Sequence, residues 1–255
     1  MRLKIAILAG AALVLAASQG QAQGFPDLGY MGTTIGAGGL QTSAMNNVIS
    51  QSVQQSRSAP RRPSGYAASA RLRQGGVAGA SASTSYRASP QVAARVRKQF
   101  ADYMTERAGA DGGRQVAAAM ERRDPVKNWA QIVAADGLRP GDAADSLAGY
   151  WILNWVIANR GDNNRAQAQA VRAQVRPIMA SNPAYARLNE PQRQEMSEVL
   201  MLNFLVQHAA YLDALKRNDQ NDLRRIGDAA VARFRNEMGV DLRQLQLTDN
   251  GFVRR

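Results

Sequence analysis

Two short segments of the chain are apolar in every direction around a helix. Residues 150–158, Tyr-Trp-Ile-Leu-Asn-Trp-Val-Ile-Ala, contain one polar residue, Asn154. Residues 199–206, Val-Leu-Met-Leu-Asn-Phe-Leu-Val, contain one as well, Asn203. A helix with no polar face must be covered by other elements, and both runs are far shorter than the roughly 20 residues of a membrane-spanning helix. The pattern therefore predicts two central helices in contact. The core side chains expected on them are Trp151, Trp155, Phe204 and Leu205.

Capping residues, prolines and glycines divide the rest of residues 89–255 into further helices. Before the second central helix, the expected helices are about 90–109, 113–123, 125–137, 142–159 and 162–181, the last with an interruption at Pro177. The chain restarts at Asn182-Pro183, and helices are expected over about 191–217 and 221–238. Leu242, Leu245 and Leu247 indicate a short irregular or extended tail, and little strand alternation is present. The predicted fold is all-α, an irregular multi-helix bundle with two central apolar helices.

Composition separates a linker from this helical domain. Residues 23–88 hold ten glycines, long Ser/Ala/Gln stretches, and six arginines against the single acid Asp27. Such a segment cannot bury enough apolar surface to offset the entropy of ordering it. We therefore expect a disordered linker over residues 23–88 and an α-helical domain over residues 89–255.

The first residues have the pattern of a secretory signal peptide. Arg2 and Lys4 precede a small and apolar run over residues 5–17, and Gly20-Gln21-Ala22 places small residues before a cleavage point. We expect residues 1–22 to be removed after Ala22, with cleavage after Ser18 as the alternative. Ser18 stands where a lipoprotein signal has its cysteine, so no lipid anchor is expected. The predicted location is the periplasm or the exterior, with no transmembrane segment in the mature chain.

Cysteine is absent from the chain. Disulfides are therefore excluded in an oxidising compartment, and stability must come from the hydrophobic core. The same absence excludes cysteine nucleophiles, zinc knuckles and iron–sulfur ligation.

The formal charge is +12, and arginines outnumber lysines by 28 to four. One interpretation is binding to phosphate or carboxylate polymers, because the guanidinium group makes bidentate contacts with these anions. The other is codon usage in a GC-rich genome, since Arg, Ala and Gly are abundant together. Nucleic acid is not an expected partner, because no recognition motif is present. The partners expected are anionic cell-envelope polymers or another envelope protein.

Residues with the spacing of a catalytic or metal site are not found. His208 is the single histidine, so no His-x-x-x-His metal pair exists, and no Gly-x-Ser-x-Gly context accompanies it. The glycines at 36–39 follow no strand and do not form a phosphate loop. We expect a partly buried structural histidine, and we assign no catalytic, cofactor or metal residues.

Glycan cleavage by carboxylates needs neither histidine nor cysteine. The available glutamates are Glu106, Glu121, Glu190, Glu195, Glu198 and Glu237. Glu195 and Glu198 fall on adjacent parts of one helical face, where solvated surface charge is the favoured interpretation. A peptidoglycan-active hydrolase or lyase remains the alternative function.

Asn154 and Asn203 occupy matching positions in the two apolar runs. A buried amide without partners costs about 1–3 kcal/mol, so each is expected to be hydrogen-bonded. A structural amide that bridges helices or satisfies a local carbonyl is favoured, and a polar site within the core is the alternative.

Residues 144–155, Ala-Asp-Ser-Leu-Ala-Gly-Tyr-Trp-Ile-Leu-Asn-Trp, together with Gly251-Phe252, resemble a family of exported bacterial proteins of unknown function. The resemblance covers the helical domain and rests on the Tyr-Trp-x-x-Asn-Trp motif. It implies export and a helical fold, and it supplies no catalytic residues. With no catalytic constellation in the sequence, the leading hypothesis is a non-enzymatic binding or interaction module of the envelope.

Overall fold

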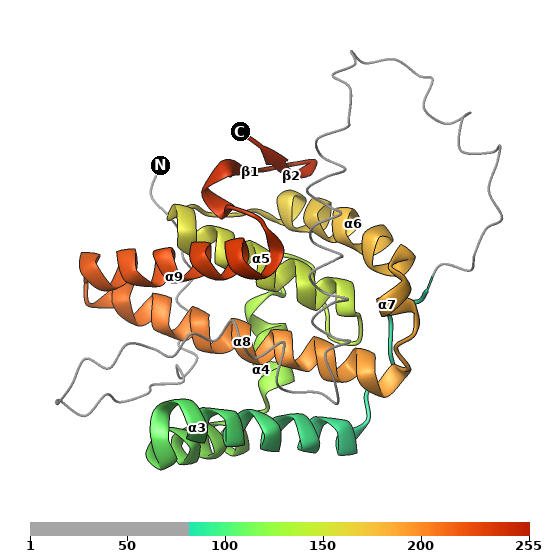
Figure 1. Ribbon diagram of the computed structural model, residues 1–255, viewed down its shortest axis with the longest axis vertical. Coiled ribbons are helices and arrows are strands. Elements are labelled where there is room, and N and C mark those ends of the chain that lie inside the picture. Colours follow the sequence, from blue (N-terminus) through green and yellow to red (C-terminus); the bar gives the residue numbers. More distant parts are fainter. Residues whose placement is uncertain (1–81) are drawn as a thin grey trace.

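The computed structural model describes residues 82–255 (Figure 1). The expected signal peptide, residues 1–22, and the expected linker up to residue 81 lie outside the described residues. The described part is mostly helical, which confirms the predicted fold class.

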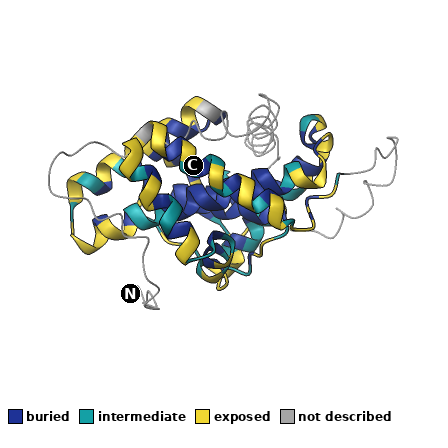
Figure 2. Ribbon diagram, turned by 90° about the horizontal axis from the view of Figure 1, so that it is seen from below, coloured by how far each residue is buried: buried dark blue, intermediate teal, exposed yellow. Residues whose placement is uncertain are grey.

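Two helices, α5 (Ala143–Asn159) and α8 (Glu190–Lys216), form the centre of the bundle and pack against each other. Trp151 is fully buried, and Trp155, Phe204 and Leu205 are at most 8% exposed. Figure 2 shows this buried region running through the middle of the molecule. The predicted pair of central helices is confirmed.

Shorter helices cover the central pair. Helices α6 (Arg165–Ser181) and α9 (Gln220–Met238) pack on α5, while α4 (Pro125–Ile132) packs on α8. The one-turn helix α7 (Pro183–Ala186) follows α6. Within residues 82–255, none of these helices is both long and apolar enough to cross a membrane.

Helix α6 differs from expectation in two ways. It starts after Asn164 instead of Asp162, because the Asn164 side chain accepts a hydrogen bond from the Gln167 N–H while Gln167 accepts one from the Asn164 N–H. This reciprocal capping box fixes the start of a helix. The helix also continues through Pro177 to Ser181 without the predicted interruption.

Helix α3 (Pro90–Arg122) is broken at Gly109, as the sequence predicts. Gly109 has φ 76° and ψ 172°, a conformation that glycine adopts without steric cost. The helix packs on α8 through a second hydrophobic cluster, separate from the main core, and Figure 1 shows α3 lying along one side of the bundle. The members of this cluster are Val92, Val96, Phe100, Tyr103, Met104, Val116, Met120, Val199, Leu202 and Val206.

The C-terminal tail is a β-hairpin. A short 3₁₀ turn (Leu242–Gln244) leads into β1 (Leu245–Thr248), which pairs antiparallel with β2 (Gly251–Arg254). The sequence predicted an extended or irregular tail, and the strand pairing was missed because each strand has only four residues.

The Tyr-Trp-x-x-Asn-Trp motif is where this tail packs onto α5. The Phe252 ring lies 5.0 Å from the Trp151 ring and 6.2 Å from the Trp155 ring, centroid to centroid. The Trp155 indole N–H also donates to the Leu245 carbonyl at 3.0 Å. Tyr150 stacks on Phe234 of α9, so the motif joins α5 to two C-terminal elements.

The folded region starts earlier than residue 89. Residues 82–86, which we call the strap, are extended and hydrogen-bonded to the bundle: the Ala82 N–H donates to the Ala180 carbonyl, and the Tyr86 N–H to the Gly141 carbonyl. The expected linker therefore differs from the structure at its C-terminal end, because polar side chains that composition places in a linker find partners on the helices.

Candidate functional site

A cluster of buried polar side chains lies at the N-terminal end of α5. Asp142 caps the helix, with its carboxylate accepting the Ala144 N–H at 2.9 Å. Asp145 lies in the first helical turn and is 1% exposed. Carboxylates at this end of a helix are stabilised by its unsatisfied N–H groups and by the helix dipole.

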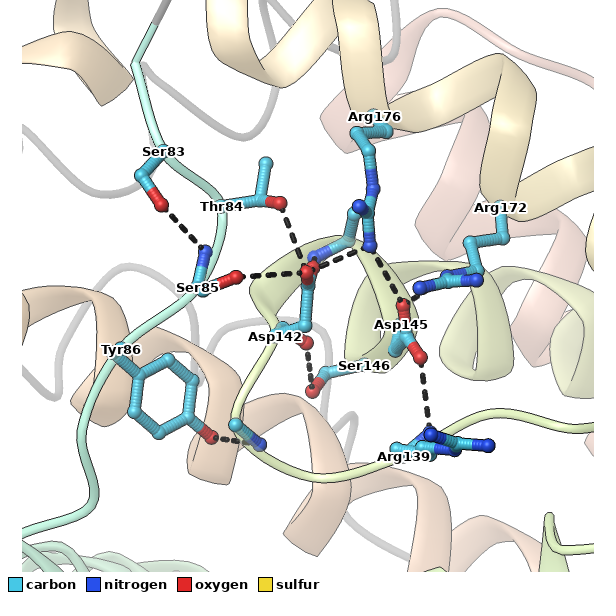
Figure 3. Close-up of polar contacts among 12 residues, drawn as sticks. Ser83, Thr84, Ser85, Tyr86, Arg139, Asp142, Asp145, Ser146, Arg172 and Arg176 are labelled. Atoms are coloured by element: carbon cyan, nitrogen blue, oxygen red, sulfur yellow. Dashed lines mark hydrogen bonds and ion pairs between the residues drawn. The ribbon is translucent and has the colours of Figure 1, made fainter.

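Two arginines of α6 hold these aspartates. Arg176 Nη2 lies 2.7 Å from Asp142 Oδ2 and 3.4 Å from Asp145 Oδ1, and Arg172 Nε donates to Asp145 Oδ1. The i, i+4 spacing places both arginines on one face of α6. Figure 3 shows the pair reaching the start of α5 from the neighbouring helix.

The environment of Asp145 perturbs its ionisation. Burial raises the pKa of the Asp145 carboxyl, and the Arg139 backbone N–H, which donates to Oδ2 at 3.0 Å, together with Arg172 offsets part of that rise. Both carboxylate oxygens are thus occupied by donors, so this aspartate is suited to fix the position of two cations.

The strap completes the cluster from the other side (Figure 3). Thr84 and Ser85 donate their hydroxyl hydrogens to Asp142 Oδ2 at 3.1 and 3.3 Å. The Ala143 N–H donates to the Thr84 carbonyl at 2.9 Å. Asp142 therefore links the strap, α5 and α6.

A chain of buried hydroxyls connects the cluster to α8. The Tyr86 hydroxyl donates to Ser197 Oγ at 3.0 Å, and Ser197 in turn is hydrogen-bonded to Ser146 of α5. Burial raises the pKa of Tyr86, while its bond to Ser197 lowers it in part. Both serines are fully buried, so this chain fixes α5 against α8 and excludes solvent.

The start of α8 anchors α3 through a side-chain amide. Gln194 Oε1 accepts the Ser89 N–H at 2.8 Å, and its Nε2 donates to the Ser89 carbonyl and to Glu198 at 2.9 and 2.7 Å. Burial raises the pKa of Glu198, and the bond from Gln194 offsets part of the rise.

Glu195 and Glu198 are not solvated surface charges, and this expectation is wrong. They are 6% and 5% exposed, and Glu195 pairs with Arg95 of α3 at 3.0 Å. The sequence pattern could not show this, because α3 covers their side of α8. Of the other glutamates, Glu106, Glu121 and Glu190 are exposed and do not join this pair, and the side chain of Glu237 lies outside the part that the structure describes.

Asn154 and Asn203 each donate to the carbonyl four residues earlier, at 2.8 and 3.0 Å. Asn154 Oδ1 also accepts from Arg233 of α9 at 2.9 Å. Both asparagines therefore satisfy a local carbonyl, and Asn154 additionally bridges two helices.

His208 is partly buried and stacks on Phe204, with ring centroids 5.6 Å apart. Burial lowers the pKa of its imidazole. Across residues 82–255, no cluster of three or more His, Cys, Asp or Glu side chains has the arrangement of a metal site. The chemistry available near α5 is therefore anion recognition by arginine and hydrogen bonding by hydroxyl and amide groups.

The arginines of α6 were missed from the sequence. A signal exists in retrospect: two aspartates three residues apart begin one helix, and two arginines four residues apart lie on the next. Pairing them needs the packing of α6 on α5, which local sequence does not specify.

The fold and this cluster define an all-α protein with an ion-paired centre at the start of its central helix. Residues 3–255 match a family of unknown function, DUF6683, and the chain belongs to that family. Comparison with curated proteins and comparison with solved structures gave no match.

Proposed function

We propose that this protein is an exported helical interaction module of the bacterial envelope, periplasmic or secreted, which binds anionic envelope polymers. The observation that carries the proposal is that buried aspartates hold two α6 arginines at the surface. Arg172 and Arg176 are 32% and 40% exposed, whereas Asp145 is 1% exposed. An arginine oriented in advance loses less entropy when it binds an anion.

Arg176 keeps hydrogen-bond donors for a ligand. Arg176 uses Nη2 for both aspartates, and its Nε and Nη1 groups donate no hydrogen bond to another residue within 82–255. A phosphate or carboxylate group can accept such N–H groups in a bidentate arrangement.

Two further arginines extend the cationic surface. Arg139 lies in the loop before α5, Arg165 is the first residue of α6, and both are exposed. The Arg165 side chain lies beside Gly137, which belongs to the same loop as Arg139. We call Arg139, Arg165, Arg172 and Arg176 the arginine row. Its four guanidinium groups lie beside the buried carboxylates of Asp142 and Asp145, and the adjoining loops also hold Asp136 and Asp162. The feature of the row that suits an anionic partner is therefore its exposed N–H donors.

A second candidate function has one observation in its favour. Glu198 combines burial with a raised pKa, and glycan cleavage requires an acid of that kind. Glu198 is, however, 5% exposed and bonded to Gln194, so a substrate reaches it only if α3 moves. The alternative is a peptidoglycan-active hydrolase or lyase.

Binding of the full chain to purified peptidoglycan and lipopolysaccharide, measured by co-sedimentation, tests the proposal. Electrostatic attraction weakens as salt shortens the screening length from about 10 Å at 0.1 M to about 3 Å at 1 M. We expect the bound fraction to fall steeply over that range, and to fall further when residues 23–81, with five more arginines, are deleted. Undiminished binding in high salt contradicts the proposal.

A zymogram on purified peptidoglycan separates the two functions. The interaction module gives no clearing, with or without the Glu198→Gln substitution. Clearing by the full chain that Glu198→Gln abolishes, with unchanged circular dichroism, establishes the hydrolase or lyase instead.

A further inference from the structure

The strap is bound to the helical body in the way a peptide ligand is bound. Its backbone makes three hydrogen bonds to the body: Ala82 N–H to Ala180 at 3.0 Å, Tyr86 N–H to Gly141 at 3.0 Å, and Ala143 N–H to Thr84 at 2.9 Å. Addition of an extended segment through main-chain bonds is a recurring mode of peptide recognition.

Alternate side chains of the strap provide specificity. Thr84 and Tyr86 are 5% and 8% exposed, whereas Ser83 and Ser85 between and before them are exposed. Tyr86 reaches Ser197, and Thr84 reaches Asp142. This alternation gives a sequence preference, hydroxyl followed two residues later by tyrosine, in an extended peptide.

The groups that receive the strap are held in place by other contacts. Asp142 caps α5 and pairs with Arg176, and Ser197 is bonded to Ser146. These receiving groups, which we call the strap site, therefore do not need the strap for their positions.

The connection between the strap and α3 permits exchange. Arg87 and Ala88 are exposed, and the next residue, Ser89, is fixed separately by both atoms of the Gln194 amide. Arg87 itself is held by one bond, from its N–H to Glu190 Oε2 at 3.3 Å, so the strap can leave its site while α3 stays on α8 when that bond breaks and the chain rotates at residues 87 and 88. Exchange of an identical element between copies preserves every contact and is a low-cost route to association.

We propose that the strap site is a peptide-binding site, and that it accepts the strap of a second copy of this chain in place of its own. The copies are linked by reciprocal or sequential strap exchange. This inference holds whether or not the arginine row binds anions.

A fluorescent peptide of residues 82–89 tests the site on the full chain. A tethered segment competes at about millimolar effective concentration, so the wild-type chain is expected to bind the peptide weakly. The full-length Tyr86→Ala chain, whose own strap lacks the ring, should bind it at least about tenfold more tightly. The same peptide with alanine in place of tyrosine is the matched control and should bind at least about tenfold more weakly.

A double variant, Thr84→Ala with Ser85→Ala, provides a second test in case the Tyr86→Ala chain does not fold. It keeps the buried ring but loses both hydroxyl bonds to Asp142, so it should also bind the peptide more tightly than the wild-type chain. If folded variants bind the peptide no better than wild type, the strap site does not exchange its occupant and the proposal is wrong.

Mixing differently tagged full chains tests the second copy as occupant. The Tyr86→Ala chain should capture the wild-type chain, whose strap is intact, and free peptide should release it. Peptide binding without any capture between copies would assign the site to a segment of another protein and overturn the second-copy proposal.

Discussion

At the scale of single residues, Asp145 is the side chain on which the ion-paired centre depends. It is nearly inaccessible to solvent, yet it receives donors from the α5 entry loop and from both arginines of α6. Asp142, three residues earlier, accepts a hydrogen bond from Thr84 of the strap and also caps α5. Because α6 packs on α5, the two buried carboxylates fix the positions of Arg172 and Arg176 at the surface.

Replacement of Asp145 by asparagine should destabilise the domain. The side-chain oxygen of asparagine can still accept the Arg139 N–H, but the charge that holds Arg172 and Arg176 is lost. The expected loss is about 1–3 kcal/mol, since hydrogen bonds to charged groups contribute at this level and both arginines are partly solvated. Urea denaturation measures it, with the exposed Asp249→Asn as control. An Asp145→Asn variant as stable as the control would contradict the assigned role.

His208 should make stability sensitive to mild acid. Because burial lowers its pKa below the ordinary 6.5, the folded state favours the neutral ring. Its contribution is fully present above pH 6.5 and is lost as pH falls through the lowered folded-state pKa.

The raised pKa values of Asp136, Asp145 and Glu198 act with the opposite sign. Their protonated forms are favoured in the fold, so these groups lose stabilising effect as pH rises above their ordinary values. Comparison with a His208→Gln variant separates the contribution of His208 to the pH dependence of stability from that of the carboxyl groups. Between about pH 7 and pH 5 the wild type should lose stability relative to this variant. If the urea midpoint changed by the same amount between the two pH values in both proteins, this role of His208 would be excluded.

At the scale of elements, the seating of the C-terminal hairpin on α5 explains the Tyr-Trp-x-x-Asn-Trp motif. Trp151 and Trp155 face Phe252, and Asn154 meets Arg233 of α9. Gly251 is required at the start of β2, since its φ is 92° and a Cβ there would lie 2.6 Å from Gln174 Oε1. The motif thus serves packing of the fold.

Trp155→Ala should remove a large part of the domain's stability. It deletes a side chain that is 8% exposed, its contacts with Phe252 and its bond to Leu245, at an expected cost of about 3–5 kcal/mol. Chemical denaturation measures the loss, and Trp155→Phe, which keeps an aromatic ring, should lose less. A small effect of the alanine variant would contradict the central position of this tryptophan.

Several helix ends were predictable because they depend on local chemistry, although α6 starts later than predicted and α4 ends at Ile132 instead of residue 137. The sequence places a helix start at residue 142 and a restart at Asn182-Pro183, and the structure uses Asp142 and Asn182 as N-caps. The strap and the burial of Glu195 and Glu198 were not predictable, since both arise from segments that are distant in sequence. The ion-paired centre was missed for the same reason.

At the scale of the whole molecule, the domain is a helical body with three attached parts: α3 on one side, the hairpin on α5, and the strap across the start of α5. Both α3 and the strap are fastened to α8, through Gln194 and Ser197. Contacts at the start of α8 thus hold both N-terminal segments on the helical body.

Limited proteolysis should delimit this body. The composition of residues 23–81 predicts cleavage within them, whereas the bonds of the strap predict protection from Ala82 onward. Thermolysin should therefore leave a fragment that begins near Ala82, identified by mass spectrometry. A stable fragment that begins at Ser89 would show that the strap does not belong to the folded body.

The most direct test of the proposed function compares two double variants with the same loss of charge. Arg139→Gln with Arg165→Gln removes two exposed members of the arginine row, and Arg122→Gln with Lys216→Gln removes two exposed cations at the ends of α3 and α8. At about 0.1 M salt, co-sedimentation with lipopolysaccharide or peptidoglycan should fall at least about fivefold for the first variant and change little for the second. Equal losses in both would mean that net charge alone drives binding and that the arginine row is not a site.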